Sequence, residues 1–73
     1  MNKVLLDIDT AIRQYMFHFD HYPKYLYMSL KTLDTAGYEE VIKLCSYDIY
    51  GIKLRLDESI ETGTVYVADE ERN

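Results

Sequence analysis

The 73-residue sequence contains one cysteine, one proline and no tryptophan, and these shortages limit what can hold the chain together. The single cysteine, Cys45, excludes an intramolecular disulfide and a metal site built from several thiolates. A domain of this size buries only about 60% of the surface that its unfolded chain exposes, so its own core provides a thin margin of stability. We therefore expect the chain to gain further burial by binding another protein or itself, with a dimer as the simplest case.

Long hydrophobic runs are also missing. A membrane-spanning helix needs about 18 to 20 consecutive apolar residues, and no segment approaches that length. Asp7 and Asp9 interrupt the apolar start at Val4, Leu5 and Leu6 before the core of a signal peptide could form. A lone cysteine and the lack of such a signal are typical of proteins inside the cell. The sequence predicts a cytoplasmic protein with no membrane partner.

Basic residues are outnumbered. Eight Lys and Arg residues stand against thirteen Asp and Glu residues, which gives a net charge of −5 and a pI near 4.8. Phosphate binding needs clustered basic side chains, so we expect no direct contact with nucleic acid. The imbalance is concentrated after residue 56, where one base, Arg72, accompanies six acids: Asp57, Glu58, Glu61, Asp69, Glu70 and Glu71.

The N-terminal segment predicts an amphipathic helix over residues 3–20. Its apolar positions recur at spacings of three and four residues, at Leu5, Ile8, Ile12, Tyr15 and Phe19. Asn2 is a suitable N-cap, and Asp9 and Arg13 form an i,i+4 pair on the polar side. Because the residue before a proline avoids the helical region, Tyr22 is the latest end of this helix.

The middle of the chain predicts a short strand and a short helix. The strand covers residues 25–28, with Leu26 and Met28 on one face and Tyr25 and Tyr27 on the other. If the first helix covers the Leu26 face, both tyrosines are left open. Ser29 then caps a helix over residues 30–36, which Gly37 ends. Residues 38–45 are compatible with a helical turn or with a packed loop.

The last third predicts β-structure. Ile52–Leu56 alternates apolar and basic residues, as a half-buried strand does, and residues 64–68 are a second β-rich run. We expect strands at about 47–56 and 64–68, a loop at 57–63, and an acidic tail at 69–73. Residues 47–50 are compatible with a separate strand, which Gly51 breaks or bulges before the strand at 52–56. The whole chain, residues 1–73, is expected to form one α+β domain. In it, an N-terminal amphipathic helix packs on a β-sheet of two to four strands, with a second short helix.

From Pro23 to Asp69 the order of these signals resembles the core supersecondary unit of the major capsid proteins of tailed phages. The residues that carry the resemblance are Pro23, Leu26-Tyr27-Met28-Ser29, Thr32-Leu33, Gly51-Ile52-Lys53-Leu54, the acidic turn 57–63, and Val65-Tyr66-Val67-Ala68-Asp69. Capsid subunits are several times longer, with a long spine helix and extended arms. The resemblance therefore implies a phage or prophage origin, or a minimal version of the unit, rather than a shell subunit. A phage-encoded chain would act in the host cytoplasm.

Catalytic and metal-binding patterns are weak. His18, Asp20 and His21 are the only cluster of metal-ligand types; the two histidines could share a helix face, but Asp20 would point elsewhere. Cys45 lies among apolar residues that favour a buried, inert thiol. The paired acids occur without a glycine-rich phosphate loop or a basic clamp. We expect no enzyme activity, no cofactor and no metal.

The tyrosines are the unusual feature, since the chain has eight of them and two phenylalanines. A domain of this size cannot bury ten rings completely, and exposed tyrosine is enriched at protein interfaces. The candidate partner-binding residues are Tyr25, Tyr27, Tyr47 and Tyr50, with the acids Glu58, Glu61 and Glu70.

Two functions follow from this reading. The first is a small non-catalytic protein-binding module. In one version it is a phage-encoded or prophage-encoded inhibitor that covers a host protein surface, its carboxylates standing where phosphates would lie. The alternative for the acidic residues after position 56 is a solvated tail that aids solubility. The second function is a structural or assembly protein that acts as a homo-oligomer through the first helix and a strand edge.

Overall fold

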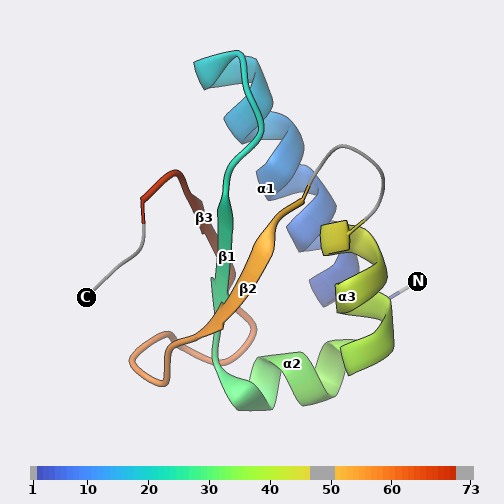
Figure 1. The fold of residues 1–73 in the computed structure, drawn as a ribbon. Coiled ribbons are helices and arrows are strands. Elements are labelled where there is room, and N and C mark those ends of the chain that lie inside the picture. Colours follow the sequence, from blue (N-terminus) through green and yellow to red (C-terminus); the bar gives the residue numbers. More distant parts are fainter. Residues whose placement is uncertain (1, 47–50, 71–73) are drawn as a thin grey trace.

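The computed structural model of the chain describes residues 2–46 and 51–70 (Figure 1). Its elements, in chain order, are α1 (Lys3–Phe19), β1 (Tyr25–Met28), α2 (Leu30–Ala36), α3 (Tyr38–Ser46), β2 (Lys53–Leu56) and β3 (Tyr66–Ala68). The strands form a single three-stranded sheet, and the helices of the described part pack against one of its faces. The predicted α+β arrangement, with the N-terminal helix on a small sheet, is confirmed.

The central strand of the sheet is β1, and the strand order is β2-β1-β3. Strand β2 runs parallel to β1, with Tyr25 opposite Lys53 and Met28 opposite Leu56. Strand β3 runs antiparallel to β1, with Tyr25 opposite Ala68. A parallel pair requires a long crossover connection, which here contains α2 and α3. These two helices therefore lie on the same side of the sheet as α1 (Figure 1).

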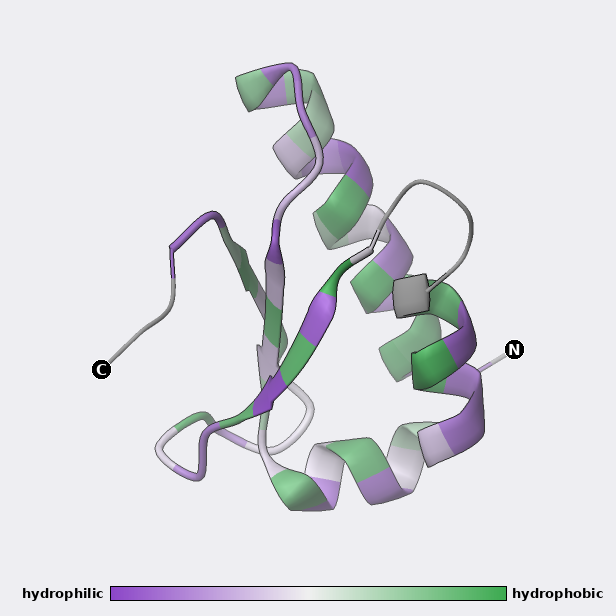
Figure 2. Cartoon of the chain, viewed as in Figure 1, coloured by the Kyte–Doolittle hydropathy of each residue, from purple (hydrophilic) through white to green (hydrophobic). Residues whose placement is uncertain are grey.

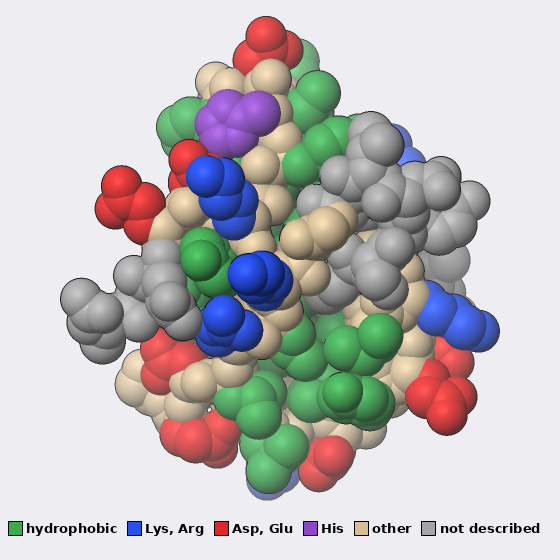
Figure 3. Space-filling model, viewed as in Figure 1, with side chains coloured by type: hydrophobic (Ala, Val, Ile, Leu, Met, Phe, Trp, Pro, Cys, Tyr) green, Lys and Arg blue, Asp and Glu red, His purple; other side chains and the backbone are tan. Residues whose placement is uncertain are grey.

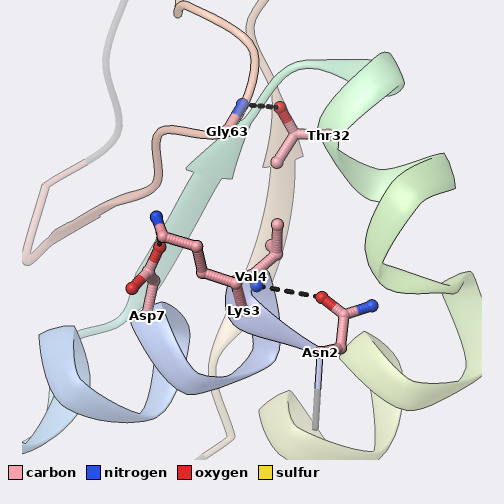
Figure 4. Close-up of polar contacts among 6 residues, drawn as sticks. All are labelled: Asn2, Lys3, Val4, Asp7, Thr32 and Gly63. Carbon is pink, nitrogen blue, oxygen red and sulfur yellow. Dashed lines mark hydrogen bonds and ion pairs between the residues drawn. The ribbon is translucent and has the colours of Figure 1, made fainter.

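Helix α1 begins as predicted. The side chain of Asn2 accepts a hydrogen bond of 2.9 Å from the Val4 N–H (Figure 4). Its amide group also donates to the carbonyl oxygens of Thr35, at 3.0 Å, and of Ala36, at 3.3 Å. The N-cap thus ties the start of α1 to the end of α2. Away from this junction, the predicted pair of Asp9 and Arg13 is present, with a nitrogen-oxygen distance of 2.8 Å.

Helix α1 ends at Phe19, one residue before the end predicted at residue 20. The next residue, Asp20, is left-handed with a φ of 61°, and its N–H donates to the Met16 carbonyl at 2.8 Å. Aspartate tolerates this conformation better than most side chains do. The chain then reverses through Pro23 and enters β1.

Helix α2 has both of the predicted boundary residues. The Ser29 hydroxyl accepts the Thr32 N–H at 3.2 Å. Gly37 follows with a φ of 93°, and its N–H donates to the Leu33 carbonyl at 2.9 Å. A positive φ favours glycine here because it carries no Cβ. The segment that the sequence left undecided is helical as α3, with two acids in its first turn and Lys43 in its last, as the helix dipole favours.

The core lies between the helices and the sheet. Figure 2 shows apolar stretches alternating with polar ones along α1 and α3, as expected of helices with one buried side. The buried apolar residues form one cluster that includes all three helices, β1 and the residue directly before β2: Val4, Ile8, Ile12, Leu26, Met28, Leu33, Ala36, Val41 and Ile52. Five of the nine come from α1 and β1. These two elements therefore supply most of the core.

One buried polar group fastens the loop before β3 to the core. Thr32 is 0% exposed, and its hydroxyl contacts the Ser29 hydroxyl at 2.8 Å. The same oxygen accepts the N–H of Gly63 at 3.0 Å (Figure 4). This bond connects α2 to the turn that leads into β3, so it helps to place that edge strand.

The strands of the last third are shorter than predicted. Strand β2 begins at Lys53, because Gly51 adopts a φ of 54° that interrupts extended backbone. Residues 47–50, which the prediction included in this strand, lie outside the described residues. Strand β3 begins at Tyr66 rather than at residue 64, since the Thr64 N–H donates to the Glu61 carbonyl at 3.1 Å in a turn.

Candidate protein-binding surface

The face of the sheet away from the helices is the main candidate surface. No helix of the described part covers it (Figure 1). The strand registers place one set of side chains on this side, and we call them the open face: Tyr25, Tyr27, Lys53, Arg55, Tyr66 and Ala68. The covered face carries the alternate residues of the same strands, among them the fully buried Leu26 and Met28. The predicted division of β1 into an aliphatic face and a tyrosine face is therefore confirmed.

Tyr25 and Arg55 form a contact on the open face. The guanidinium carbon of Arg55 lies 5.4 Å from the centroid of the Tyr25 ring, within the range of a cation-π interaction. The Tyr25 ring is half-buried, and its centroid lies 6.3 Å from that of Tyr27. Arg55 also donates from Nη1 to the carbonyl of Leu54 at 3.2 Å. Both side chains are thus held in place by contacts within the chain.

The prediction that Tyr27 is open is wrong, since only 3% of it is exposed. Tyr27 lies on the central strand, between Arg55 on β2 and Tyr66 on β3. Its hydroxyl reaches the chain beyond β3, where it donates to the Glu70 carbonyl at 3.4 Å. Alternation assigned Tyr27 to the correct face but did not show that its ring is covered there. Tyr27 therefore supports the surface rather than presenting its ring to solvent.

Tyr66 is the open ring that the sequence reasoning did not select. It lies directly opposite Tyr27 in the antiparallel pair, and it is 50% exposed. The register between β1 and β3 decides this position, and the sequence shows no signal of that register. The alternation of residues 64–68 alone places the Tyr66 side chain on the other face of the strand from Val65 and Val67. It does not show which side of the strand is open, so the exposure of Tyr66 depends on the register.

The open side of the sheet is basic although the chain is acidic. Figure 3 shows Lys and Arg side chains gathered over β1 and β2. The basic residues of these segments are Lys53 and Arg55 in β2 and Lys24 directly before β1. The Lys53 N–H donates to the Lys24 carbonyl at 2.9 Å, so residues far apart in the sequence become backbone neighbours. The parallel pairing creates a basic cluster that composition alone could not indicate.

The predicted acidic residues are not brought together. Glu58 and Glu61 lie in the loop after β2, at the end of the sheet where β1 stops, whereas Glu70 follows β3 at the end where β1 starts. Glu58 Oε2 accepts the Leu30 N–H at 2.8 Å, so this carboxylate caps α2. Glu61 and Glu70 are exposed. Of the other candidates, Tyr47 and Tyr50 lie outside the described residues.

The histidines do not share a helix face, because α1 ends at Phe19 and His21 lies beyond it. His21 Nδ1 is 3.1 Å from the Tyr22 carbonyl oxygen and 3.9 Å from the nearer carboxylate oxygen of Asp69. His18 remains on the exposed side of α1. Among residues 2–46 and 51–70, no three histidine, cysteine, aspartate or glutamate side chains are grouped to hold a metal ion.

The end of α1 forms a second exposed surface, made of aromatic rings. Phe17 is 88% exposed and Phe19 is 58% exposed. Tyr15 packs its ring 4.5 Å from that of Phe19 and 5.6 Å from that of His21. Burial raises the pKa of the Tyr15 hydroxyl above its ordinary value, and the nearby charge of Asp69 adds to the rise. Beside these rings lies a shallow groove, lined by Ile12, Arg13, Met16, Phe17 and Tyr22.

Comparisons with known proteins add no family or function to this geometry. The sequence matches no family model, no curated protein and no solved structure. Within the described ranges, none of the helices has the length and apolar character to cross a bilayer. The function must therefore be inferred from the surfaces themselves.

Proposed function

We propose that the protein is a small non-catalytic protein-binding module and that the open face of the sheet is its binding surface. One observation carries the proposal: the helices pack on a single face, which leaves the other face with a half-exposed Tyr66 and a basic cluster in an acidic chain. Tyrosine and arginine are among the residue types enriched at the centres of protein interfaces.

The arrangement suits binding because its side chains are already ordered. Tyr25, Tyr66, Lys53 and Arg55 project from paired strands, so the backbone beneath them is fixed by the sheet. Arg55 is further held by the Tyr25 ring and the Leu54 carbonyl. A surface that is ordered before binding loses less conformational entropy when a partner arrives. This favours a rigid docking face over a loop that folds upon binding.

An inhibitor that covers a host protein surface is one form of this proposal, in keeping with the phage-like order of elements in the sequence. The open face supports surface covering better than it supports mimicry of nucleic acid. Mimicry needs several carboxylates on one side, whereas Glu58 caps α2 and Glu61 and Glu70 lie at opposite ends of the sheet. A covering inhibitor would thus use its tyrosines and bases instead of its acids.

Self-association through α1 is the second candidate, and a different observation favours it. Phe17 is the most exposed large apolar side chain of the described residues, and it stands at the rim of the groove lined by Ile12 and Met16. In a two-fold dimer, Phe17 of each copy could enter the groove of the other, since an isologous interface makes every contact twice.

Site-specific photo-crosslinking in cell extract tests both candidates. A photoreactive phenylalanine analogue would replace Tyr66 on the open face, Phe17 on α1, or Tyr38 at the start of α3. All three side chains are at least half exposed, at 50%, 88% and 62%. We expect a discrete crosslink to another protein from position 66, because this ring lies on the proposed surface. Position 38 is the matched control.

The outcomes separate the candidates. A product of twice the chain mass from position 17, with none from position 66, would replace the binding module by the homo-oligomer. Equal, diffuse labelling from positions 66 and 38 would contradict a defined surface on the sheet. Sedimentation at two concentrations completes the test, since a monomer at high concentration excludes assembly through α1.

A further inference from the structure

Strand β2 presents a backbone edge, beside the open face, with which no strand of residues 2–46 and 51–70 pairs. It is an outer strand of the sheet, and within residues 2–46 and 51–70 it pairs with β1 alone. The N–H groups of Lys53 and Asp57 donate to Lys24 and Met28, both at 2.9 Å. In a parallel ladder, alternate residues turn their backbone groups to the partner strand. The N–H and C=O groups of Leu54 and Leu56 are therefore directed away from β1.

The two sides of this edge differ in chemistry. Lys53 and Arg55 lie on the open face, whereas Leu54 and Leu56 lie on the side of the helices. Leu56 is 51% exposed, and Leu30, at the start of α2, is 49% exposed. Figure 3 shows hydrophobic side chains gathered at the surface around the end of β2 and the start of α2. A strand added to this edge would meet bases on one side and leucines on the other.

A second copy of the chain is a poor occupant of the edge. If two β2 strands paired antiparallel about a two-fold axis, the Lys53 and Arg55 side chains of one copy would lie beside those of the other. Like charges directly opposite each other destabilise a strand pair. Basic residues on an edge strand are a common protection against such pairing. The basic residues thus disfavour pairing between the β2 strands of two copies. The same charges favour an acidic strand as the partner.

We propose that the edge of β2 binds an extended segment of a partner protein in which acidic and apolar residues alternate. The acidic side chains would lie beside Lys53 and Arg55, and the apolar ones beside Leu54 and Leu56. Backbone hydrogen bonds would supply affinity, and the alternating side chains would supply specificity, as in other cases of strand addition. This inference rests on the proposed function and names the partner of the same surface.

Arg55 provides the exchange that such binding requires. In the unbound chain its Nη1 donates to the Leu54 carbonyl at 3.2 Å. That carbonyl belongs to the edge, so an incoming backbone N–H can take the place of the guanidinium. The displaced Nη1 can instead donate to a carboxylate of the incoming strand, which makes a stronger, charge-assisted bond. An acidic strand compensates for the bond that it displaces, whereas a neutral or basic strand does not.

Single-stranded nucleic acid could also contact the basic side chains with its phosphates and the aromatic rings with its bases, but the observations favour a peptide. The free N–H and C=O pattern of an edge strand is matched by another strand and not by a sugar-phosphate chain. The net charge of −5 repels a long polyanion, whereas a short acidic segment meets mainly the local bases. Nucleic-acid binding is therefore kept as an outcome that would overturn the proposal.

Peptide titration tests the inference. The probe is a capped ten-residue peptide of alternating Glu and Val, labelled with a fluorophore, and its match replaces every Glu by Lys. We expect the Glu peptide to bind at least about tenfold more tightly than the Lys peptide, which corresponds to about 1.4 kcal/mol. In the double variant K53E/R55E the preference should reverse. A Glu peptide with N-methylated alternate amides should lose binding, because it cannot pair with the edge.

Amide chemical shifts locate the contact. The N–H signals of Leu54 and Leu56 should move and gain protection from hydrogen exchange when the Glu peptide binds. The inference is overturned if these signals stay unchanged, if both peptides bind equally, or if a ten-nucleotide oligothymidine competes at the same residues. Circular dichroism verifies that the double variant is folded, and the single variant K53E, at an exposed side chain, is the second test. If the Glu peptide does not bind but position 66 still crosslinks to another protein, this inference alone is rejected and the proposed function stands.

Discussion

The two faces of β1 contrast within four residues. Leu26 and Met28 point to the helices and are 0% exposed. Tyr25 and Tyr27 point the other way, and they differ from each other, since Tyr25 is half-buried and Tyr27 is 3% exposed. On the covered face, burial comes from whole helices. On the open face, where no helix of the described part lies, the ring in the middle of the sheet is covered, whereas the ring at the start of β1 is covered only in part.

This difference separates the roles of the two faces. Side chains of the covered face are fully committed to the core, and a change there affects folding. Side chains of the open face keep exposed surface, and a change there should affect the proposed binding more than folding. A small domain has a free energy of unfolding of only about 5 to 15 kcal/mol, so a change in the core removes a large fraction of it. A loss of folding is therefore easily distinguished from a loss of binding.

The largest predicted effect comes from Leu26→Ala on the covered face. Removing a fully buried leucine leaves a cavity in the core, which should lower the free energy of unfolding by about 2 to 5 kcal/mol. The matched substitution Tyr25→Ala, at the preceding residue, should cost about 1 kcal/mol, since it removes a half-buried ring and its contact with Arg55. Urea denaturation of both variants measures the difference.

Equal losses of stability from the two substitutions would contradict the contrast between the faces. They would mean that the Tyr25 ring supports the core as Leu26 does. A Tyr66→Ala variant then provides a further control, because this ring is half exposed on the neighbouring strand.

A smaller effect is predicted for Thr32→Val, which shows that the covered side also depends on a polar group. Valine keeps the shape of threonine but removes the oxygen that accepts the Gly63 N–H and contacts the Ser29 hydroxyl. Leaving these partners without a hydrogen bond should cost about 1 to 3 kcal/mol. The control Thr32→Ser keeps the oxygen and loses only a methyl group, so it should cost about 0.8 kcal/mol if the methyl is fully buried.

The measurement is again denaturant unfolding, with the Gly63 amide followed by hydrogen exchange. Faster exchange at Gly63 in Thr32→Val, and unchanged exchange in Thr32→Ser, is the expected pattern. A valine variant as stable as the parent would show that the Thr32 oxygen contributes only shape.

These elements also show what the sequence could and could not predict. Strand β1 and helix α2 have the predicted limits because local chemistry marks both ends: Pro23 before the strand, the Ser29 cap between the two, and Gly37 after the helix. The start of α1 directly after its N-cap Asn2 was predictable for the same reason. Local signals acted over a few residues, and there the predictions were accurate.

The register of the strands was not predictable, because it depends on contacts between residues far apart in the sequence. The basic cluster arises only when Lys53 is placed beside Lys24, and the exposure of Tyr66 only when it is placed opposite Tyr27. Net charge predicted an acidic protein, which is correct as a sum and wrong for this surface. The sequence therefore predicted Tyr25 as a member of the candidate surface, but it did not predict which other residues lie beside it.

The smallest predicted effect lies where the two layers meet, at the end of α1 beside β3. Burial of the Tyr15 hydroxyl and the charge of Asp69 both disfavour the tyrosinate, so the folded chain holds this proton at a pKa above the ordinary 10.0. Above pH 10 the folded state binds more protons than the unfolded state, and the free energy of unfolding must fall as the pH rises through this pKa. Stability from this source is fully present below pH 10. In Tyr15→Phe the decline above pH 10 should be shallower than in the parent, as measured by urea unfolding at a series of alkaline pH values. Asp69→Asn, which removes only the charge, should show an intermediate slope, and parallel slopes in all three proteins would mean that the end of α1 is open to solvent there, like the rim of the open face.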